Sequence, residues 1–391
     1  MKLSSLVKTA RRLDERWQRS IRPNERRVLV NARTAMNYAT LAPIIERLQK
    51  DQRIELFFTA SENPERVAEI FSEANPPFQL ITPSGAASRR FDVYLAADFL
   101  WVNLPRGTTR IQTFHGVAGK YRTIYDSPTT SMREWDRLFF INQRRMQHFM
   151  DSKAIDTDSS AACLIGMPKL DALVDGSLVR NEVLSSLGLD PSRPTVLYAP
   201  TWSPYSSVCL MGEELVRKLG DAGYTVIVKL HDRSLDMLYA NSGGVNWRER
   251  LEPVVQKVGG RMASGSNSSP FLAAADVLIT DHSSVGFEFL VLDRPLVRIH
   301  LPDLIAHTDI EPAYVEMMAS TSSSCTTVHE VLDAVEQAFT DPEEHSTARK
   351  LVANELFFKP GTATARAVDE IYRIMNIGPP ASVYPNADLR N

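Results

Sequence analysis

The 391-residue sequence is poor in cysteine and has no long apolar run. Its three cysteines, Cys163, Cys209 and Cys325, neither pair evenly nor share a metal-ligand spacing, so we expect a reducing, cytoplasmic compartment. No apolar stretch reaches about 18 residues, and the N-terminus lacks the apolar core of a signal peptide. We therefore expect no transmembrane helix and no cleaved leader.

The charge and the glycine pattern exclude further classes of protein. The formal net charge is −3, so we do not expect the chain to bind nucleic acid. No predicted strand is followed by the Gly-x-Gly-x-x-Gly pattern of dinucleotide-binding folds, which argues against a nicotinamide-dependent dehydrogenase. Histidine and cysteine form no cluster with ligand spacing, so we expect neither a metal nor a cofactor.

What the sequence does contain is a regular alternation of short apolar runs with helical stretches. This alternation predicts parallel sheets covered by helices on both faces, and the length is sufficient for two such domains. We place the domain boundary within residues 166–193, which contain Gly, Pro and a charged connector. The expected parts are a basic helix at 1–25, an N-terminal domain at 26–175, a C-terminal domain at 190–376 and a loose tail at 377–391.

The first 27 residues carry nine Lys or Arg against three acidic residues. Their apolar residues, from Leu3 through Trp17 to Ile21, recur at helical spacing, which predicts a basic amphipathic helix. Such a helix can lie on an anionic membrane surface, or it can be a surface helix docked on the protein's own domain. The one-sided charge favours the membrane.

Residues 276–284 form the most informative segment of the chain. An apolar strand ends at Thr280-Asp281, Ser283-Ser284 follow His282, and a second apolar run begins at Val285. Serines are good N-caps, and the backbone N–H groups at a helix start can bind an anion. The segment therefore suggests a nucleotide diphosphate as ligand, although an ordinary capped strand–helix junction has the same pattern.

Polar residues also follow three other predicted strands. They are found in Thr113–Gly116, in Tyr198–Trp202 and in Val228–Arg233. Ligands of doubly wound domains bind at the carboxyl ends of the strands, so we expect all four segments to face a cleft between the two domains. One histidine at a strand end is more often structural, but four polar strand ends favour a binding site.

In this order and spacing, the segments resemble the CDP-glycerol glycerophosphotransferase family, which includes teichoic acid primases and polymerases. The resemblance runs from about residue 110 to 375 and departs from the family pattern at Ser203, Asp232 and His282. The residues that carry it are His115-Gly116 with Lys120, Tyr198–Trp202, Lys229–His231, Asp276–Ser284 and Gly361–Arg366.

The resemblance implies a GT-B fold and a transferase. The enzyme would move glycerol phosphate, or a related polyol phosphate, from CDP-glycerol or a related CDP-polyol to a hydroxyl of a lipid-linked or glycan acceptor, releasing CMP. This reaction belongs to teichoic acid and cell-wall polymer synthesis on the inner face of the cell membrane, where the protein would be peripheral.

Two alternatives remain open at this point. A GT-B sugar transferase or sugar-nucleotide epimerase would use a UDP- or GDP-sugar, with Glu288 and Arg294 near the diphosphate. A non-catalytic membrane-bound scaffold would keep the fold and bind nucleotide weakly or not at all.

The resemblance also implies roles for individual residues. His115 is the expected base for the acceptor hydroxyl, with donation to a phosphate oxygen as its competing role. His231, the second expected catalytic residue, would face the diphosphate. Asp281 would orient a histidine or contact the glycerol. The other expected substrate-binding residues are Gly116, Lys120, Pro200, Thr201, Lys229, Thr280, Ser283, Ser284 and Arg366.

Overall fold

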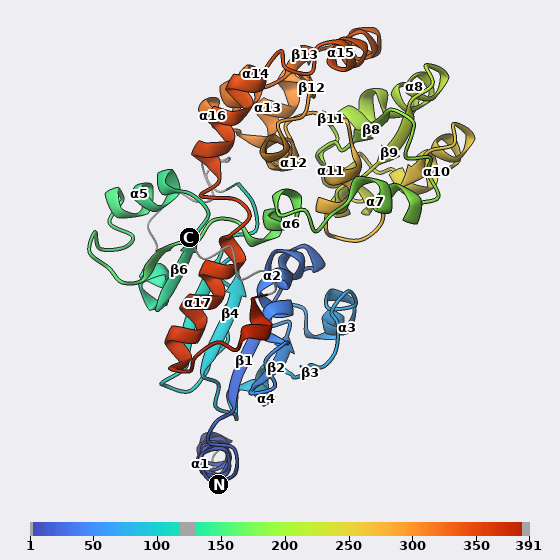
Figure 1. Ribbon diagram of the computed structural model, residues 1–391. Coiled ribbons are helices and arrows are strands. Elements are labelled where there is room, and N and C mark those ends of the chain that lie inside the picture. The colour runs from blue at the N-terminus through green and yellow to red at the C-terminus, as the bar shows by residue number, and fades with distance from the viewer. Residues whose placement is uncertain (1–2, 118–129, 385–391) are drawn as a thin grey trace. The chain divides into compact units, whose positions relative to one another are not determined.

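The computed structural model describes residues 3–117 and 130–384, which divide into two compact units (Figure 1). Within this part of the chain, unit 1 holds residues 3–117, 130–171 and 358–384, and unit 2 holds residues 172–357.

Unit 1 is built on a parallel sheet whose described strands follow the order β3-β2-β1-β4-β5-β6-β7. The central strands are buried on both faces, as expected of a parallel sheet covered by helices. The strands are β1 (Arg26–Asn31), β2 (Ile54–Thr59), β3 (Gln79–Leu80), β4 (Val93–Ala97), β5 (Thr109–Thr113), β6 (Arg137–Phe140) and β7 (Ala162–Leu164).

Helices from both ends of the chain cover this sheet. Its α-helices are α1 (Leu3–Ile21), α2 (Ala35–Leu48), α3 (Val67–Ile70), α4 (Pro83–Ala87), α5 (Gln143–Asp151) and α17 (Ala363–Met375), and α6 (Asp171–Val174) crosses to unit 2. Short 3₁₀ turns lie at Pro64–Arg66, Thr130–Glu134, Pro168–Leu170 and Ala381–Val383.

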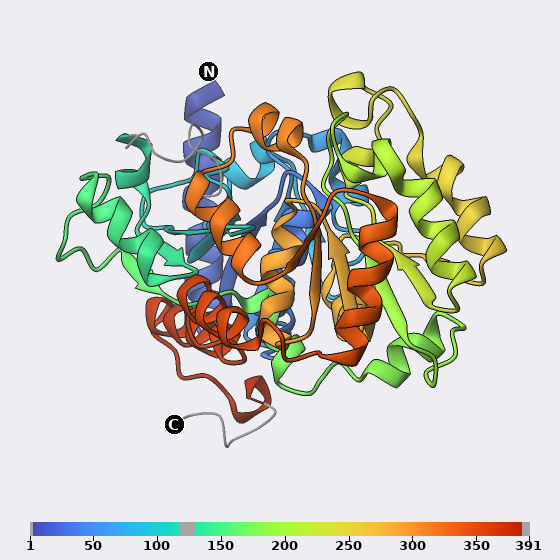
Figure 2. The same cartoon turned by 90° about the horizontal axis from the view of Figure 1, so that it is seen from above.

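The last long helix belongs to unit 1, which corrects the predicted extent of the second domain to residue 376. Helix α17, drawn in red in Figures 1 and 2, packs beside α2 and β4. Its apolar face is buried in the core of unit 1. The Tyr372 hydroxyl donates to Asp51 at 2.9 Å, and Arg137 pairs with Glu370 at 2.6 Å. Helical periodicity over residues 362–375 predicts this helix, but periodicity does not tell which sheet the helix covers.

Helix α1 lies within the predicted N-terminal segment, at the amino-terminal edge of the unit 1 sheet. Its two acidic residues face the unit: Asp14 pairs with Arg27 at 2.8 Å, and Glu15 pairs with Arg90 at 2.7 Å. Leu13 is 62% exposed, so this helix presents an apolar residue to solvent while its acids bind the sheet edge.

Unit 2 repeats the architecture with a second parallel sheet, ordered β10-β9-β8-β11-β12-β13 among the described strands. These strands are β8 (Thr195–Tyr198), β9 (Thr225–Val228), β10 (Arg261–Met262), β11 (Val277–Thr280), β12 (Leu296–Ile299) and β13 (Ser323–Cys325). Both sheets therefore confirm the predicted class of two doubly wound α/β domains. The cleft expected between them stays a prediction.

The helices of unit 2 follow the predicted alternation, with additions. The α-helices are α7 (Arg180–Ser186), α8 (Ser207–Asp221), α9 (Tyr239–Ser242), α10 (Trp247–Lys257), α11 (Ser269–Ala274), α12 (Ser284–Phe289), α13 (Pro302–Thr308), α14 (Pro312–Ser320), α15 (Val328–Thr340) and α16 (Ser346–Leu356), with 3₁₀ turns at Asp232–Leu235 and Leu290–Leu292. Helices α13 and α14, each with proline in its first turn, were not expected from periodicity. In the part of the chain that the structure covers, no helix is both long and apolar enough to cross a membrane.

Each sheet reverses its direction of winding between two neighbouring strands. In unit 1 these are β1 and β4, and in unit 2 they are β8 and β11. Loops diverge at such a point and leave room for a ligand at the carboxyl ends of the strands. The predicted segments Tyr198–Trp202 and Asp276–Ser284 lie at the reversal in unit 2.

Candidate functional site

His115 follows β5 at the carboxyl edge of the unit 1 sheet, where it pairs with Asp98. The His115 Nδ1 lies 2.5 Å from an Asp98 carboxylate oxygen, and the histidine side chain is 34% exposed. When Nδ1 carries a proton, the other ring nitrogen, Nε2, can accept a proton from a substrate. No described residue makes a hydrogen bond to Nε2. The predicted base therefore has an oriented ring with an available nitrogen.

Asp98 is held in place by an unusual backbone and by Asn37. Asp98 and Phe99 have φ of 60° and 58°, and the Phe99 amide donates to the Gln112 side chain at 2.7 Å. The Asn37 side chain donates to the Asp98 carboxylate at 2.7 Å from the first turn of α2, whose N-cap is Thr34. A left-handed backbone at two consecutive non-glycine residues is strained and persists where the surroundings enforce it, which is common at functional sites.

The pair shifts both pKa values toward the ionised forms. Burial alone would lower the pKa of His115, but the charge and hydrogen bond of Asp98 outweigh it and the net pKa is raised. Burial would raise the pKa of Asp98, but His115, then Asn37 and Arg33, lower it. Sequence reasoning missed Asp98 and Asn37, although Asp98 does follow a buried strand directly.

Two further predicted residues lie near His115 in the sequence. A Cβ added at Gly116 would meet nothing within 4 Å, so packing within the chain does not require glycine there. Glycine at this point leaves the backbone open to close approach by a ligand. Lys120 lies outside the described residues. Lys169, which the sequence did not suggest, adds a positive charge that opposes protonation of His115.

In unit 2, Asp281 joins the two strand ends at the reversal of the sheet. Its carboxylate accepts from the Thr201 amide at 2.8 Å and from the Ser207 amide and hydroxyl at 3.2 and 3.0 Å. The side chain is fully buried. Next to it, Thr280 is also fully buried and donates from its hydroxyl to the Ala199 carbonyl at 2.6 Å. These bonds hold the Pro200-Thr201 turn against β11.

The histidine and lysine that follow β9 lie on the same edge. The His231 Nδ1 accepts from the Arg233 amide at 3.1 Å and caps a 3₁₀ turn, which places the proton of the neutral ring on Nε2. The Arg233 guanidinium lies 4.4 Å from the centroid of the Trp202 ring. Lys229 is half-buried, and its ammonium donates to the Leu230 carbonyl at 3.1 Å.

The Ser283 and Ser284 hydroxyls lie between β11 and α12. Both residues are half-buried, and Ser283 is the N-cap of α12 without making a side-chain capping bond. Within the described residues, neither hydroxyl has a hydrogen-bond partner. They are therefore available to a ligand at the carboxyl edge of β11.

Arg366 lies in unit 1 and makes several bonds within the protein. Its guanidinium donates to the carbonyls of Ile165, Phe358 and Lys359 and to the Thr362 hydroxyl. These bonds tie α17 to the segment by which the chain returns from unit 2. The role of Arg366 in substrate binding stays a prediction.

The residues proposed for a sugar-nucleotide site also have partners in the fold. The Arg294 guanidinium donates to the Ala273 and Ala275 carbonyls at 2.8 and 2.7 Å, at the end of α11. Glu288 is 4% exposed and accepts from the Ser268 hydroxyl at 3.1 Å. The carbonyls that Arg294 binds lie at the end of α11, and the Ser268 hydroxyl that Glu288 binds lies at its start.

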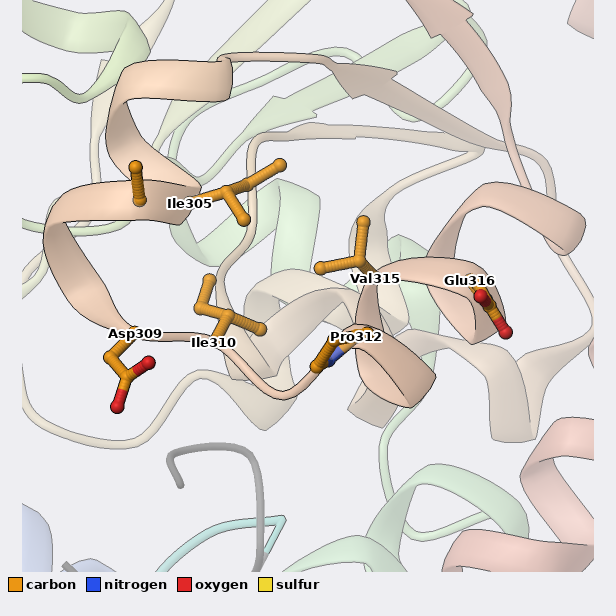
Figure 3. A pocket seen from close by; sticks show the side chains of 7 residues that line it. Ile305, Asp309, Ile310, Pro312, Val315 and Glu316 are labelled. Atoms are coloured by element: carbon orange, nitrogen blue, oxygen red, sulfur yellow. The ribbon is translucent and has the colours of Figure 1, made fainter. Parts of the chain in front are cut away.

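Two pockets in the described residues are lined by none of the predicted site residues. The larger, about 320 Å³, lies between α13 and α14 and is lined by Ile305, Ile310, Pro312 and Val315 (Figure 3). Its charged lining residues, Asp309 and Glu316, are both acidic. In the part of the chain that is described, no three His, Cys, Asp or Glu residues are placed to hold a metal ion.

Comparison with known proteins identifies the fold and the family. The chain is 26% identical over 235 residues to the teichoic acid poly(glycerol phosphate) polymerase of Bacillus spizizenii, a match that covers 54% of this chain and 56% of that protein. The chain thus spans about half the length of this relative.

Solved structures share the fold across most of the chain. The wall teichoic acid polymerase TagF, in a variant soaked with CDPG, has a TM-score of 0.67 at 17% identity and covers 90% of each chain. A putative UDP-N-acetylglucosamine 2-epimerase from Listeria monocytogenes has a TM-score of 0.56 at 16% identity, covering 91% of this chain and 98% of that one. The two parallel-sheet units are therefore GT-B-like.

The family itself is given by a sequence model. The model described as CDP-Glycerol:Poly(glycerophosphate) glycerophosphotransferase matches residues 78–373, which include the His115, Asp281 and Ser283 segments. This chain therefore belongs to the CDP-glycerol:poly(glycerophosphate) glycerophosphotransferase family.

Proposed function

We propose that the chain transfers glycerol phosphate, or a related polyol phosphate, from a CDP-activated donor to an acceptor hydroxyl and releases CMP. The observation that carries the proposal is the oriented His115, with a carboxylate on one ring nitrogen and the other available, in a chain of this family. The CDPG soaked into TagF supports CDP-glycerol as the donor.

In the proposed reaction, the acceptor oxygen attacks the β-phosphorus of the donor. The bond from that phosphorus to the bridging oxygen breaks, and CMP leaves with the electron pair. His115 Nε2 takes the hydroxyl proton, and the Asp98 carboxylate balances the imidazolium that forms. Phosphoryl transfer needs mainly positioning and charge stabilisation from a protein, which suits a site made of donors and one base.

The strand ends of unit 2 are proposed to hold the diphosphate. The Ser283 and Ser284 hydroxyls would donate to phosphate oxygens, as would the Nε2–H of His231. Lys229 would add a positive charge. Asp281 and Thr280 would act through the backbone that they fix, because both side chains are fully buried.

Nucleotide release tests the proposed reaction. The purified chain is offered CDP-glycerol, CDP-ribitol, a UDP-sugar and a GDP-sugar separately, each with a bacterial lipid or glycan extract. We expect CMP from a CDP-polyol and no release from the sugar nucleotides. Release of UDP or GDP, or equal release by wild type and His115→Ala, would contradict the proposal.

The acceptor is proposed to be lipid-linked, with α1 holding the protein on the inner membrane face. Asp14 and Glu15 bind α1 to unit 1, while Arg12 and Arg16 are exposed beside Leu13. A basic surface with an exposed apolar residue suits an anionic bilayer.

Vesicle binding tests this part of the proposal without removing the contacts that dock α1. Substituting Arg12 and Arg16 by Gln should weaken binding to anionic vesicles by about fivefold for each arginine, from about 1 kcal/mol per charge. Arg217→Gln, an exposed site on α8, is the matched control. Equal pelleting of the double variant and the control would refute membrane binding through α1.

A further inference from the structure

Unit 2 contains a buried guanidinium that is bonded to two histidines. Arg298, on β12, is 4% exposed. Its Nη1 lies 3.3 Å from His282 Nε2 and 2.9 Å from His300 Nδ1, and its Nη2 donates to the Ser324 hydroxyl at 2.8 Å. Its Nε is buried without a hydrogen-bond partner.

This arginine differs from two others that are buried to a similar degree. Arg27 pairs with Asp14 and Glu55, and Arg349 pairs with Asp293 at 3.0 Å. Among the described residues, Arg298 has no carboxylate partner. A guanidinium stays protonated in proteins, and a buried charge without a counter-charge is strongly unfavourable. Arg298 therefore carries a positive charge that an anion would balance.

The arginine also determines which nitrogen of each histidine carries a proton. Because the guanidinium can only donate, His282 must accept through Nε2 and His300 through Nδ1. Burial, followed by the charge of Arg298, lowers the pKa of His300 and favours its neutral form. A neutral His300 then carries its proton on Nε2, for which the described residues supply no acceptor.

The cluster lies directly beside the loop that is proposed to hold the donor. In the sheet, Arg298 is in register with Thr280 on β11 and with Ser324 on β13. His300 lies two residues beyond Arg298, just past the carboxyl end of β12. His282 lies inside the loop, next to Ser283. The buried charge is thus one hydrogen bond away from the loop.

We propose that His282, Arg298 and His300 form an anion-binding subsite for the diphosphate of the donor. The His300 Nε2–H donates to a phosphate oxygen, Arg298 supplies the balancing charge, and His282 connects that charge to the Ser283-Ser284 loop. The inference rests on the proposed function, because it assigns the cluster to the CDP-activated donor. The alternative role is a purely structural bridge between β11, β12 and β13.

Ligand binding by the full chain separates these roles. Titration calorimetry would compare inorganic pyrophosphate, CDP-glycerol and cytidine on wild type, Arg298→Met and His300→Phe. We expect both variants to bind pyrophosphate and CDP-glycerol at least about tenfold more weakly, as for a lost hydrogen bond to a charged group, with cytidine binding unchanged. His329→Phe, which alters an exposed histidine on α15, is the control for His300→Phe.

Thermal stability supplies a second readout. Removing a buried charge that has no counter-charge removes its desolvation cost, whereas removing one partner of a buried ion pair leaves an uncompensated charge and is destabilising. Arg298→Met should therefore keep or raise the Tm, and Arg349→Met should lower it.

Three results would overturn the subsite. The first is that Arg298→Met loses as much Tm as Arg349→Met and also binds cytidine more weakly. The second is that both variants bind pyrophosphate and CDP-glycerol as tightly as wild type. The third is that wild type binds neither pyrophosphate nor CDP-glycerol. Unchanged CDP-glycerol affinity with CMP release intact would overturn the subsite and leave the proposed function standing. Arg298-dependent pyrophosphate binding without CDP-glycerol binding would support the subsite and overturn the donor.

Discussion

Asp98 and Asp281 occupy corresponding positions in the two units, and they do different work. Asp98 directly follows β4, which lies beside β1, and Asp281 directly follows β11, which lies beside β8. Strands β1 and β8 are the first strands of their sheets in the sequence. The Asp98 carboxylate accepts from the His115 ring and the Asn37 side chain. The Asp281 carboxylate accepts from the amides of Thr201 and Ser207 and from the Ser207 hydroxyl.

The difference shows how one topology supports two functions. In unit 1 the carboxylate orients an imidazole that is one-third exposed and raises its pKa, so the strand end presents a base. In unit 2 the carboxylate is fully buried and fixes the backbone, so the strand end presents hydroxyls and amide groups. Substitutions at the two sites should therefore change different properties of the protein.

The largest effect is expected at His115 itself. His115→Ala removes the base that accepts the hydroxyl proton, and CMP release from CDP-glycerol should fall by about 10²–10⁴-fold. His329→Ala removes an exposed histidine of unit 2 and should leave the rate unchanged. A fall of less than about threefold in His115→Ala would place the base elsewhere.

The next effect is expected at Asp98, and it has a characteristic pH dependence. A base acts when deprotonated, so kcat/KM should rise as the pH increases through the raised pKa of His115. Asp98→Asn removes the charge that raises this pKa, so the rise should move to lower pH. The plateau should fall about 100-fold, because the ring loses its orientation and the imidazolium loses its counter-charge.

The pH profile of kcat/KM distinguishes a positioning residue from a structural one. If Asp98→Asn lowered the plateau of kcat/KM but left the rise at the same pH, Asp98 would support the fold and would not raise the pKa of His115.

Substitution of Asp281 should lower the stability of the fold more than substitution of Asp98 does. Asp281→Asn keeps the shape but loses the charge-assisted bonds to two amides and a hydroxyl, which should lower the free energy of unfolding by about 2 kcal/mol. Urea unfolding of this variant beside Asp98→Asn measures the difference. If Asp98→Asn proved the less stable of the two, the division of roles between the carboxylates would be wrong.

A smaller effect is expected at the two serines of unit 2. Ser283→Ala combined with Ser284→Ala removes two hydroxyl donors that have no partner within the described residues, so the fold should lose little stability. Donor affinity should weaken about tenfold, as for one or two hydrogen bonds to a charged phosphate, and the pH profile should not move. Loss of turnover at saturating donor without a change in affinity would contradict this assignment.

Much of this arrangement could be read from the sequence, because the signals are local. The short apolar runs Val277–Thr280 and Leu296–Ile299 are bounded by polar residues, and this pattern alone predicts strands with the limits of β11 and β12. The polar residues after them lie at the carboxyl edge because all neighbouring strands are parallel.

Other features depend on tertiary contacts and could not be read in advance. Asp98 has a left-handed backbone and pairs with His115, which follows the neighbouring strand β5. The spacing of residues in the sequence predicts neither the pair nor the backbone conformation. The sequence predicts one helix over Pro64–Ala74, but the structure has a 3₁₀ turn at Pro64–Arg66 followed by the short α3, which ends at Ile70. Helix α17 was predicted in place, but its packing partner is set by the cores of the two units.

The most direct test is the affinity of His115→Ala for CDP-glycerol, measured beside its rate of CMP release. We expect the variant to bind the donor as tightly as wild type, because unit 2 is proposed to hold the diphosphate, and to release almost no CMP. If binding and release were lost together and in proportion, His115 would be a donor ligand and the division between the units would fail.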